Sequence, residues 1–202
     1  DFILLNLSII ISFMFILKKK YFFIIKSIKE IELKNIKNFG KYSIIYRNES
    51  PEDIEEIKIF RFACKIKKIP FYISNNIDLM VALKADGLYV SAHNQQLNVI
   101  NLKNKYNIIG SAHNIREINI KKNQGCSIIF LSRLFKTHYK NKESFLGVVR
   151  FNLLTKLTNI PLSPLGGINI SNLNKLNKVN CESLALSSII ISKPIEIQRL
   201  LK

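Results

Sequence analysis

Short apolar runs alternate with helix-type repeats along the chain from about residue 20 onward. The apolar runs are typical of buried strands, which are expected at 21–25, 42–46, 70–73, 87–90, 107–109, 127–131, 161–165 and 182–186. Ile or Leu repeated at helical spacing predicts helices at 28–38, 50–68, 77–83, 114–121, 145–157, 169–179 and from 187 or 188 to 201. Ser50 is expected to cap the second helix, with Pro51 at its first position.

Strands that are each followed by a helix or a spacer predict parallel pairing with right-handed crossovers. Eight such units fit a compact α/β fold, the (β/α)8 TIM barrel, over residues 20–202. An open doubly wound sheet is the alternative, but it normally carries a glycine-rich turn after its first strand. Residues 26–29 contain no glycine, so the barrel is the predicted architecture.

Residues 1–19 are expected to form an apolar extension outside this domain. The segment 2–17 is almost wholly apolar, and Lys18, Lys19 and Lys20 follow it. This run is shorter than the roughly 20 residues of a membrane span, and its positive charges follow the apolar part, whereas those of a secretory signal precede it. We expect an upstream extension or a helix packed on the domain, with membrane association through residues 2–17 as the alternative.

The charge balance is strongly basic, but its distribution is diffuse. The 202 residues include 31 Lys and Arg against 14 Asp and Glu, which gives a net charge of +17. The lysines spread from Lys18 to Lys202 in a chain rich in Ile, Lys and Asn, a bias that an AT-rich genome produces without a basic function. No zinc finger, helix-turn-helix signature or aromatic-rich basic segment accompanies them. A small anionic substrate is therefore favoured over nucleic acid or a membrane surface as the partner.

The three cysteines, Cys64, Cys126 and Cys181, are widely spaced and odd in number. They form neither a disulfide framework nor a paired metal-binding knuckle. A reducing compartment, the cytoplasm, is therefore the expected location, and Cys64 and Cys126 are expected in the core.

Polar residues follow most of the expected strands, where a TIM barrel carries its active site. Gly166 and Gly167 follow the seventh strand, and Ser187 and Ser188 follow the eighth. Backbone N–H groups at such places often bind phosphate in this fold, although a plain turn and a helix cap would use the same residues. The other polar strand-end residues include Arg47, Asn48, Glu49, Ser74, Asn75, Asn76, Ser91, Asn94, Ser111, Arg133, Thr137, Tyr139 and Lys140.

All three histidines, His93, His113 and His138, also follow expected strand ends. Each stands on a different loop without a paired carboxylate or cysteine nearby, which is a poor pattern for a metal site. Histidine titrates near neutral pH, so the three positions favour general acid–base catalysis.

The strand-end segments resemble the thiamine phosphate synthase/TenI family, in order, from about Lys20 to the C-terminus. The most specific pieces are ADGLYVS at 85–91, IIGSAHN at 108–114 and PLGGI at 164–168. Segments 44–47 and 135–140 add to the match, and the Ser187–Ser188 pair follows Gly167 at the spacing of the family's phosphate site. The resemblance implies a TIM barrel and an enzyme of thiamine biosynthesis that acts on small phosphorylated substrates.

One chemistry that the resemblance implies is that of a synthase-type transferase. It joins a thiazole phosphate to a pyrimidine methyl diphosphate and releases pyrophosphate, with Mg²⁺ offsetting the charge of the leaving group. Arg47 stands at the place of the family's pyrimidine-binding arginine, Glu49 replaces a lysine, and Asn75 and Asn94 occupy two metal-binding Asp positions. Because an amide oxygen is a weaker Mg²⁺ ligand than a carboxylate, no metal ligand is assigned. Mg²⁺ is expected as a cofactor only if synthase activity is retained.

The second chemistry is a TenI-type isomerisation, a proton shift in the thiazole that needs no metal. The resemblance implies that His113 is its acid–base group, and it places Arg47 and Lys140 among the catalytic residues. It also implies a substrate-binding set of Ser111, Thr137, Tyr139, Gly167, Ser187 and Ser188. A catalytically inactive member that binds thiazole phosphate or a partner protein is the alternative.

Overall fold

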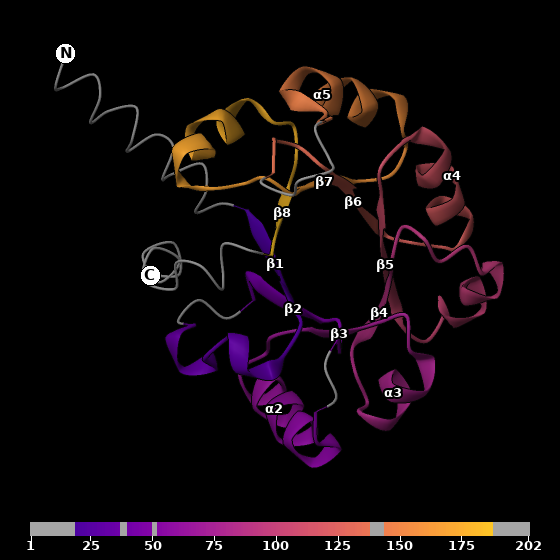
Figure 1. Cartoon of the computed structure of the whole chain (residues 1–202). Helices are drawn as coiled ribbons and strands as arrows, with labels where there is room; N and C mark the ends of the chain where they lie inside the picture. The colour runs from indigo at the N-terminus through magenta and orange to yellow at the C-terminus, as the bar shows by residue number, and fades with distance from the viewer. Residues whose placement is uncertain (1–18, 37–39, 50–51, 138–143, 188–202) are drawn as a thin grey trace, which may run out of the picture.

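A closed ring of parallel strands lies at the centre of the computed structural model, with helices around it (Figure 1). The structure describes residues 19–36, 40–49, 52–137 and 144–187. The strands are β1 (Lys20–Ile25), β2 (Tyr42–Tyr46), β3 (Phe71–Ser74), β4 (Gly87–Val90), β5 (Asn107–Ala112), β6 (Ile128–Ser132), β7 (Leu162–Leu165) and β8 (Ser183–Leu186). Consecutive strands pair in parallel, and β8 closes the ring on β1 with Lys20 opposite Ser183. The predicted (β/α)8 TIM barrel is confirmed.

The ends of the strands agree with the sequence pattern within one residue, except at β5. This strand continues to Ala112, whereas the pattern predicts its end at Ile109. Gly110 and Ser111 suggest a loop by residue type, but they pair in register with Ile129 and Phe130 of β6. Ser111 therefore belongs to the barrel wall and not to the loop that follows it.

Four α-helices and four 3-10 segments connect the strands within the described ranges. They are η1 (Ile28–Glu30), η2 (Leu33–Asn35), α2 (Ile54–Ile66), α3 (Ile77–Ala82), η3 (Leu97–Leu102), α4 (Ile115–Asn123), α5 (Gly147–Leu157) and η4 (Ile170–Lys178). The continuous helix predicted over 28–38 is wrong, because Ile31 and Ile36 have extended backbone and end two short 3-10 turns. β-Branched side chains favour such extended backbone. The helix predicted to begin at Asn169 does begin there, with Asn169 as its cap, but it is a 3-10 segment. The pattern does not predict η3.

Short polar side chains cap three of the described α-helices, namely α2, α3 and α4. Asp53 caps α2, where its carboxylate accepts a hydrogen bond from the Glu55 N–H at 3.0 Å. The prediction that the helix starts at Ser50 is wrong, because the first helical residue is Ile54; Ser50 itself lies outside the described residues. Asn114 caps α4, as its sequence pattern predicts.

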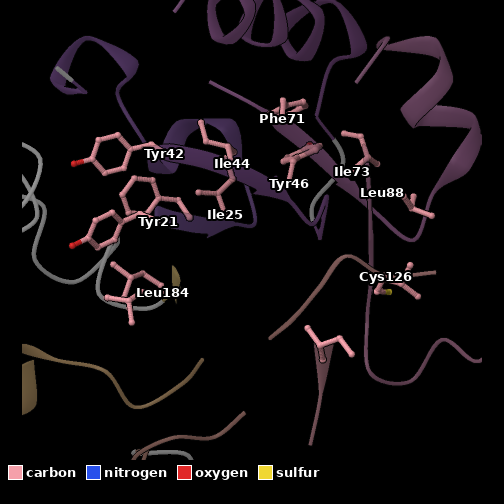
Figure 2. Packing of buried hydrophobic residues seen from close by; sticks show 14 of the residues in the cluster. Tyr21, Ile25, Tyr42, Ile44, Tyr46, Phe71, Ile73, Leu88, Cys126 and Leu184 are labelled. Carbon is pink, nitrogen blue, oxygen red and sulfur yellow. The ribbon is translucent and has the colours of Figure 1, made fainter. Parts of the chain in front are cut away.

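Alternate residues along the strands divide the core into two layers. The inner layer fills the barrel with strand residues only, namely Phe22, Ile24, Ile45, Tyr72, Tyr89, Ile109, Phe130 and Ala185. Within it, the ring centroids of Phe22 and Phe130 lie 4.9 Å apart in an edge-to-face arrangement. The outer layer lies between strands and helices, and Figure 2 shows Tyr21 and Tyr42 side by side in it. Burial of both strand faces explains why the apolar runs are nearly continuous.

The three cysteines are free and buried, as expected for Cys64 and Cys126. Burial raises the pKa of the Cys64 and Cys126 thiols to about 12 and that of Cys181 to about 11. The apolar extension up to residue 18 and the helix predicted after residue 187 lie outside the described residues. In the part of the chain that is described, no helix has the length and apolar character needed to cross a membrane.

Candidate active site

Arg47 follows β2 at the C-terminal end of the barrel, and an acid already pairs with it. Its Nη2 lies 3.0 Å from Oε1 of Glu49, whose Oε2 lies 2.7 Å from Nζ of Lys26. The hydrogen bond from Lys26 is the main cause of the lowered pKa of Glu49, and the charge of Arg47 adds to it against the effect of burial. An ionised Glu49 offsets part of the positive charge that a diphosphate would need here.

Glu52 joins the segments that follow β1 and β2. Its Oε1 accepts a hydrogen bond from Ser27 Oγ at 2.6 Å, and its Oε2 accepts one from the Tyr46 hydroxyl at 2.5 Å. The Ile28 N–H donates to the same carboxylate at 3.2 Å. Burial acts to raise the pKa of Glu52, but these hydrogen bonds outweigh it and the pKa is lowered. This bonding holds the strand end that carries Arg47.

Asn75 and Asn94, which the resemblance aligns with metal-binding Asp residues, are joined by a hydrogen bond. Asn75 Oδ1 accepts from the Ser91 N–H at 3.0 Å and from Asn94 Nδ2 at 3.4 Å. Asn75 Nδ2 donates to Ser91 Oγ at 3.0 Å, and Asn94 Oδ1 accepts from the Gln96 N–H at 3.0 Å. The side-chain oxygens of both amides therefore already have protein donors.

These residues do not fit Mg²⁺. The ion prefers carboxylate oxygens, and two carboxylates in this place would repel each other unless a cation held them. Amides carry no charge, and the side-chain oxygens of Asn75 and Asn94 accept hydrogen bonds from protein N–H groups without a cation. Among the residues that the structure describes, no group of three or more His, Cys, Asp or Glu side chains is placed to hold a metal.

His113 follows β5 directly, and Glu117, one helical turn later, orients it. Glu117 Oε2 accepts from the His113 N–H at 2.8 Å and lies 2.9 Å from Nδ1 of the ring. Asn114 and Glu117 bond reciprocally at the start of α4. Burial acts to raise the pKa of Glu117, but the hydrogen bonds from His113 and Asn114 lower it further than burial raises it. With Nδ1–H directed at the Glu117 carboxylate, the neutral ring carries its lone pair on Nε2.

His93 lies on the loop after β4 and faces His113. The centroids of the two imidazole rings are 6.0 Å apart. Two of the three histidines predicted at strand ends are thus neighbours, while His138 lies outside the described residues.

Ser111 lies deeper than the two histidines, within β5. Its side chain is buried, and its Oγ accepts a hydrogen bond from the Tyr89 hydroxyl at 2.9 Å. Both residues stand on strands that line the barrel, so Ser111 lies at the top of the inner layer. Its contact with a substrate stays a prediction.

The loops after β6 and β7 pack on one another at Gly167. A Cβ at this position would lie 2.2 Å from the Phe135 carbonyl oxygen, and the residue has a φ of 71°. In the loop after β6, Thr137 Oγ1 accepts a hydrogen bond from Arg133 Nη1 at 3.1 Å. Packing therefore explains the glycine by itself, and phosphate binding by Gly167 and Thr137 stays a prediction.

The remaining predicted site residues are only partly covered. Ser187 follows β8 directly and is half-buried. Tyr139, Lys140 and Ser188 lie outside the described residues. Their roles, like that of Arg47, stay predictions.

Sequence reasoning misses the residues that position the site. Glu117 carries a signal, because an asparagine cap followed three residues later by a glutamate is a helix-start pattern and position i+4 faces His113. Glu52 has no local sequence signal, because its partner Ser27 lies 25 residues away along the chain.

Two hollows open at the opposite end of the strands. One of about 420 Å³ is lined by residues at the starts of strands, among them Lys20, Ile128 and Ser183. The other, of about 570 Å³, lies beside Asn107 and Ser127. Neither is lined by a histidine; His93 and His113 follow the C-terminal ends of β4 and β5.

Comparison with known proteins agrees with this geometry. Residues 25–190 match the family model described as thiamine monophosphate synthase. The chain is 31% identical over 127 residues to a thiamine-phosphate synthase of Prochlorococcus marinus strain SARG, over 60% of this chain and 37% of that protein. It is 25% identical over 130 residues to a thiamine-phosphate synthase of Methanococcus vannielii, over 61% of this chain and 62% of that protein.

Solved structures show the same fold. A thiamine phosphate pyrophosphorylase from Pyrococcus furiosus has a TM-score of 0.73 at 17% identity, over 92% of this chain and 96% of that chain. A 2-keto-3-deoxy-6-phospho-gluconate aldolase from Zymomonas mobilis has a TM-score of 0.64 at 12% identity, over 93% of each chain. The fold therefore does not settle the chemistry.

The family model covers most of the chain, whereas the chain spans only about a third of the Prochlorococcus relatives. The match includes the strand-end segments with Arg47, His113 and Gly167, and it confirms the resemblance seen in the sequence. The chain belongs to the thiamine monophosphate synthase family.

Proposed function

We propose that this chain is a thiamine-biosynthesis enzyme that binds a thiazole phosphate and shifts a proton on its ring, with His113 as the acid–base group. The observation that carries the proposal is the pairing of His113 Nδ1 with Glu117 at 2.9 Å, at the C-terminal end of the barrel. The asparagine pair supports it, because Asn75 and Asn94 suit a reaction without a metal better than one that needs Mg²⁺.

The hydrogen bond to Glu117 gives His113 a defined role. In the neutral ring, Nδ1–H donates to the carboxylate and Nε2 carries the lone pair. Nε2 takes a proton from a thiazole carbon, and the ionised Glu117 stabilises the imidazolium that results. A proton is then added at a different position of the thiazole, so the net reaction is an isomerisation. A positioned acid–base group of this kind contributes about 10²- to 10⁴-fold in rate.

The phosphate of the substrate is proposed to bind at the loops after β6, β7 and β8. Thr137 and Gly167 stand on two loops that pack together, and Ser187 follows the neighbouring strand. Backbone N–H groups in this part of a TIM barrel commonly bind phosphate. Lys140 and Ser188 are proposed to contribute to the same site from the sequence alone.

Arg47 supports a second candidate function, the transfer of a pyrimidine methyl diphosphate onto the thiazole phosphate. Its position after β2 suits the diphosphate substrate, and the relatives that the chain matches are thiamine-phosphate synthases by name. Glu49 argues against the transferase, because its carboxylate pairs with the Arg47 guanidinium at 3.0 Å, in the place that the diphosphate would take.

Calorimetric titration separates the two candidates. Thiazole phosphate and the pyrimidine methyl diphosphate are each titrated into the full chain, with and without Mg²⁺. Thiazole phosphate is expected to bind equally in both conditions, and the diphosphate is expected not to bind. Binding of both, with the diphosphate tightened by Mg²⁺, would replace the isomerase proposal with the transferase. Binding of neither would reject both.

The acid–base role is tested by turnover of the thiazole carboxylate phosphate, followed by proton NMR. His113→Gln is expected to lower kcat by about 100-fold or more, because the glutamine amide cannot take up and release a proton as the imidazole does. The control is Glu56→Gln, an exposed acid on α2. Wild-type turnover in His113→Gln would show that the proton passes through another group.

A further inference from the structure

Two fully buried polar side chains, Lys121 of α4 and Gln124 at its C-cap, bond to the loop after β4. Lys121 Nζ donates to the Asn94 carbonyl, and to Gln124 Oε1 at 2.9 Å. Gln124 Nε2 donates to the carbonyls of Asn94 at 3.1 Å and of Gln96 at 3.0 Å. A buried ammonium and a buried amide cost free energy unless they are paired, and here the main chain of one loop supplies the partners.

This loop carries His93. His93 directly precedes Asn94, and its ring faces His113 at a centroid distance of 6.0 Å. The first turn of α4 holds His113 through Glu117, and the last part of α4 holds the His93 loop through Lys121 and Gln124. Glu117 therefore bonds the His113 ring directly, whereas Lys121 and Gln124 bond the main chain beside His93.

Simple filling of the core does not account for this arrangement. Apolar side chains of the same volume would fill the space without the desolvation that a buried ammonium entails. What Lys121 and Gln124 add is directional bonding to two carbonyls of one short segment. The loop is bonded at its other side as well, where Ser91 and Asn94 bond to Asn75. Bonds on both sides restrict the position of His93, which lies between them.

We propose that Lys121 and Gln124 are positioning residues that hold His93 opposite His113, and that His93 is the second acid–base group of the site. The catalytic half of this inference rests on the proposed proton shift. One neutral imidazole takes a proton from a thiazole carbon, while the other, protonated, gives one to a different atom of the same ring. The two imidazoles thereby exchange protonation states, and proton exchange with water restores them, so no oxidant or further reactant is needed.

The positioning half is tested by NMR of the histidine ring signals in the full chain at constant pH. His93→Gln is expected to shift the ring signals of His113, because a neighbouring aromatic ring is lost. Lys121→Met and Gln124→Met are expected to shift the same signals, since they release the His93 loop. Lys122→Met is the matched control, because Lys122 is the next residue of α4 and is exposed.

Unchanged His113 signals in Lys121→Met and Gln124→Met would overturn the positioning role. If either variant fails to fold, Gln124→Glu replaces it, because this change keeps the size of the side chain and removes its donors to Asn94 and Gln96. The readout does not depend on turnover, so it decides the positioning role even if the proposed function is wrong.

The catalytic half is tested by kcat and KM for thiazole isomerisation, with active sites counted by titration of thiazole phosphate. His93→Gln and Lys121→Met are expected to lower kcat at least tenfold and to leave KM within twofold, whereas Lys122→Met changes neither. Full kcat in His93→Gln, in an assay where His113→Gln is inactive, would overturn the role of His93. Absence of turnover in the wild-type chain would instead reject the proposed function, and with it the catalytic half.

Discussion

At the scale of single residues, hydrogen bonds decide the charge state of the half-buried acids. For both Glu52 and Glu117, burial is the largest single effect and raises the pKa, yet the sum of hydrogen bonds lowers it. Each carboxylate has donors on both oxygens, from the Tyr46 and Ser27 hydroxyls in one case and from His113 and Asn114 in the other. These acids hold strand ends and helix starts in place while they are ionised.

The Glu52 bonds predict a loss of stability in acid. The folded pKa of Glu52 lies below its usual value of 4.5, so its contribution is fully present above pH 4.5 and is lost as the pH falls through the folded pKa. Glu52→Gln should lower the free energy of unfolding at pH 7 and make it less dependent on pH below 4.5. Urea unfolding at pH 7, 4 and 3 measures this.

The exposed Glu56→Gln serves as the control for this series. A pH dependence in Glu52→Gln that equals the wild type would show that other acids cause the acid unfolding.

The sequence predicts single residues of the site where the signal is local. His113 and its neighbour Asn114 can be found because a strand end, a cap and a helix follow one another within ten residues. The bond between Asn75 and Asn94 cannot be found in this way, because it joins the loops after two neighbouring strands, β3 and β4. Its existence depends on the barrel as a whole.

At the scale of elements, the helices and strands follow the sequence pattern where one face is apolar and a cap is present. α4 fulfils both conditions, and it forms within two residues of its predicted bounds. The segment 28–38 has the apolar spacing of a helix, but its described residues, 28–36, form η1 and η2. Its Ser27 side chain bonds to Glu52 as well as to the Lys29 N–H, so tertiary contacts compete with the helix start.

The contact between the loops after β6 and β7 predicts a large effect of one methyl group. Gly167→Ala would place a Cβ 2.2 Å from the Phe135 carbonyl oxygen at a φ of 71°, so the backbone must move. We expect the free energy of unfolding to fall by more than about 2 kcal/mol, as measured by urea unfolding.

Gly147→Ala is the matched control, because Gly147 has a similar φ of 70° and its nearest atom would lie 4.0 Å away. This variant carries the backbone strain, about 1–2 kcal/mol, without the steric collision. Equal losses in the two variants would mean that strain alone, and not the packing of the loops, explains Gly167.

At the scale of the whole molecule, the charge balance acts on every residue at once. At a net charge of +17 over 202 residues, the positive side chains repel one another in the folded state. This prediction needs only the sequence. Salt screens charges beyond about 10 Å at 0.1 M. We therefore expect Tm to rise as NaCl increases from 10 to 300 mM at pH 7, as measured by calorimetry.

The same titration near pH 9.9, where the net charge falls to about zero, serves as the control and should show a much smaller rise. A fall in Tm with salt at pH 7 would mean that local ion pairs such as Arg47–Glu49 outweigh the long-range repulsion.

The three buried thiols have a practical consequence for studies of how the barrel unfolds. Cys64 stands in α2, Cys126 just before β6 and Cys181 just before β8, so they sample three separate sectors of the ring. Thiol reagents react with thiolates, and burial with raised pKa values protects all three in the native chain. Their labelling rates, read separately by mass spectrometry, report whether the sectors open together or one after another.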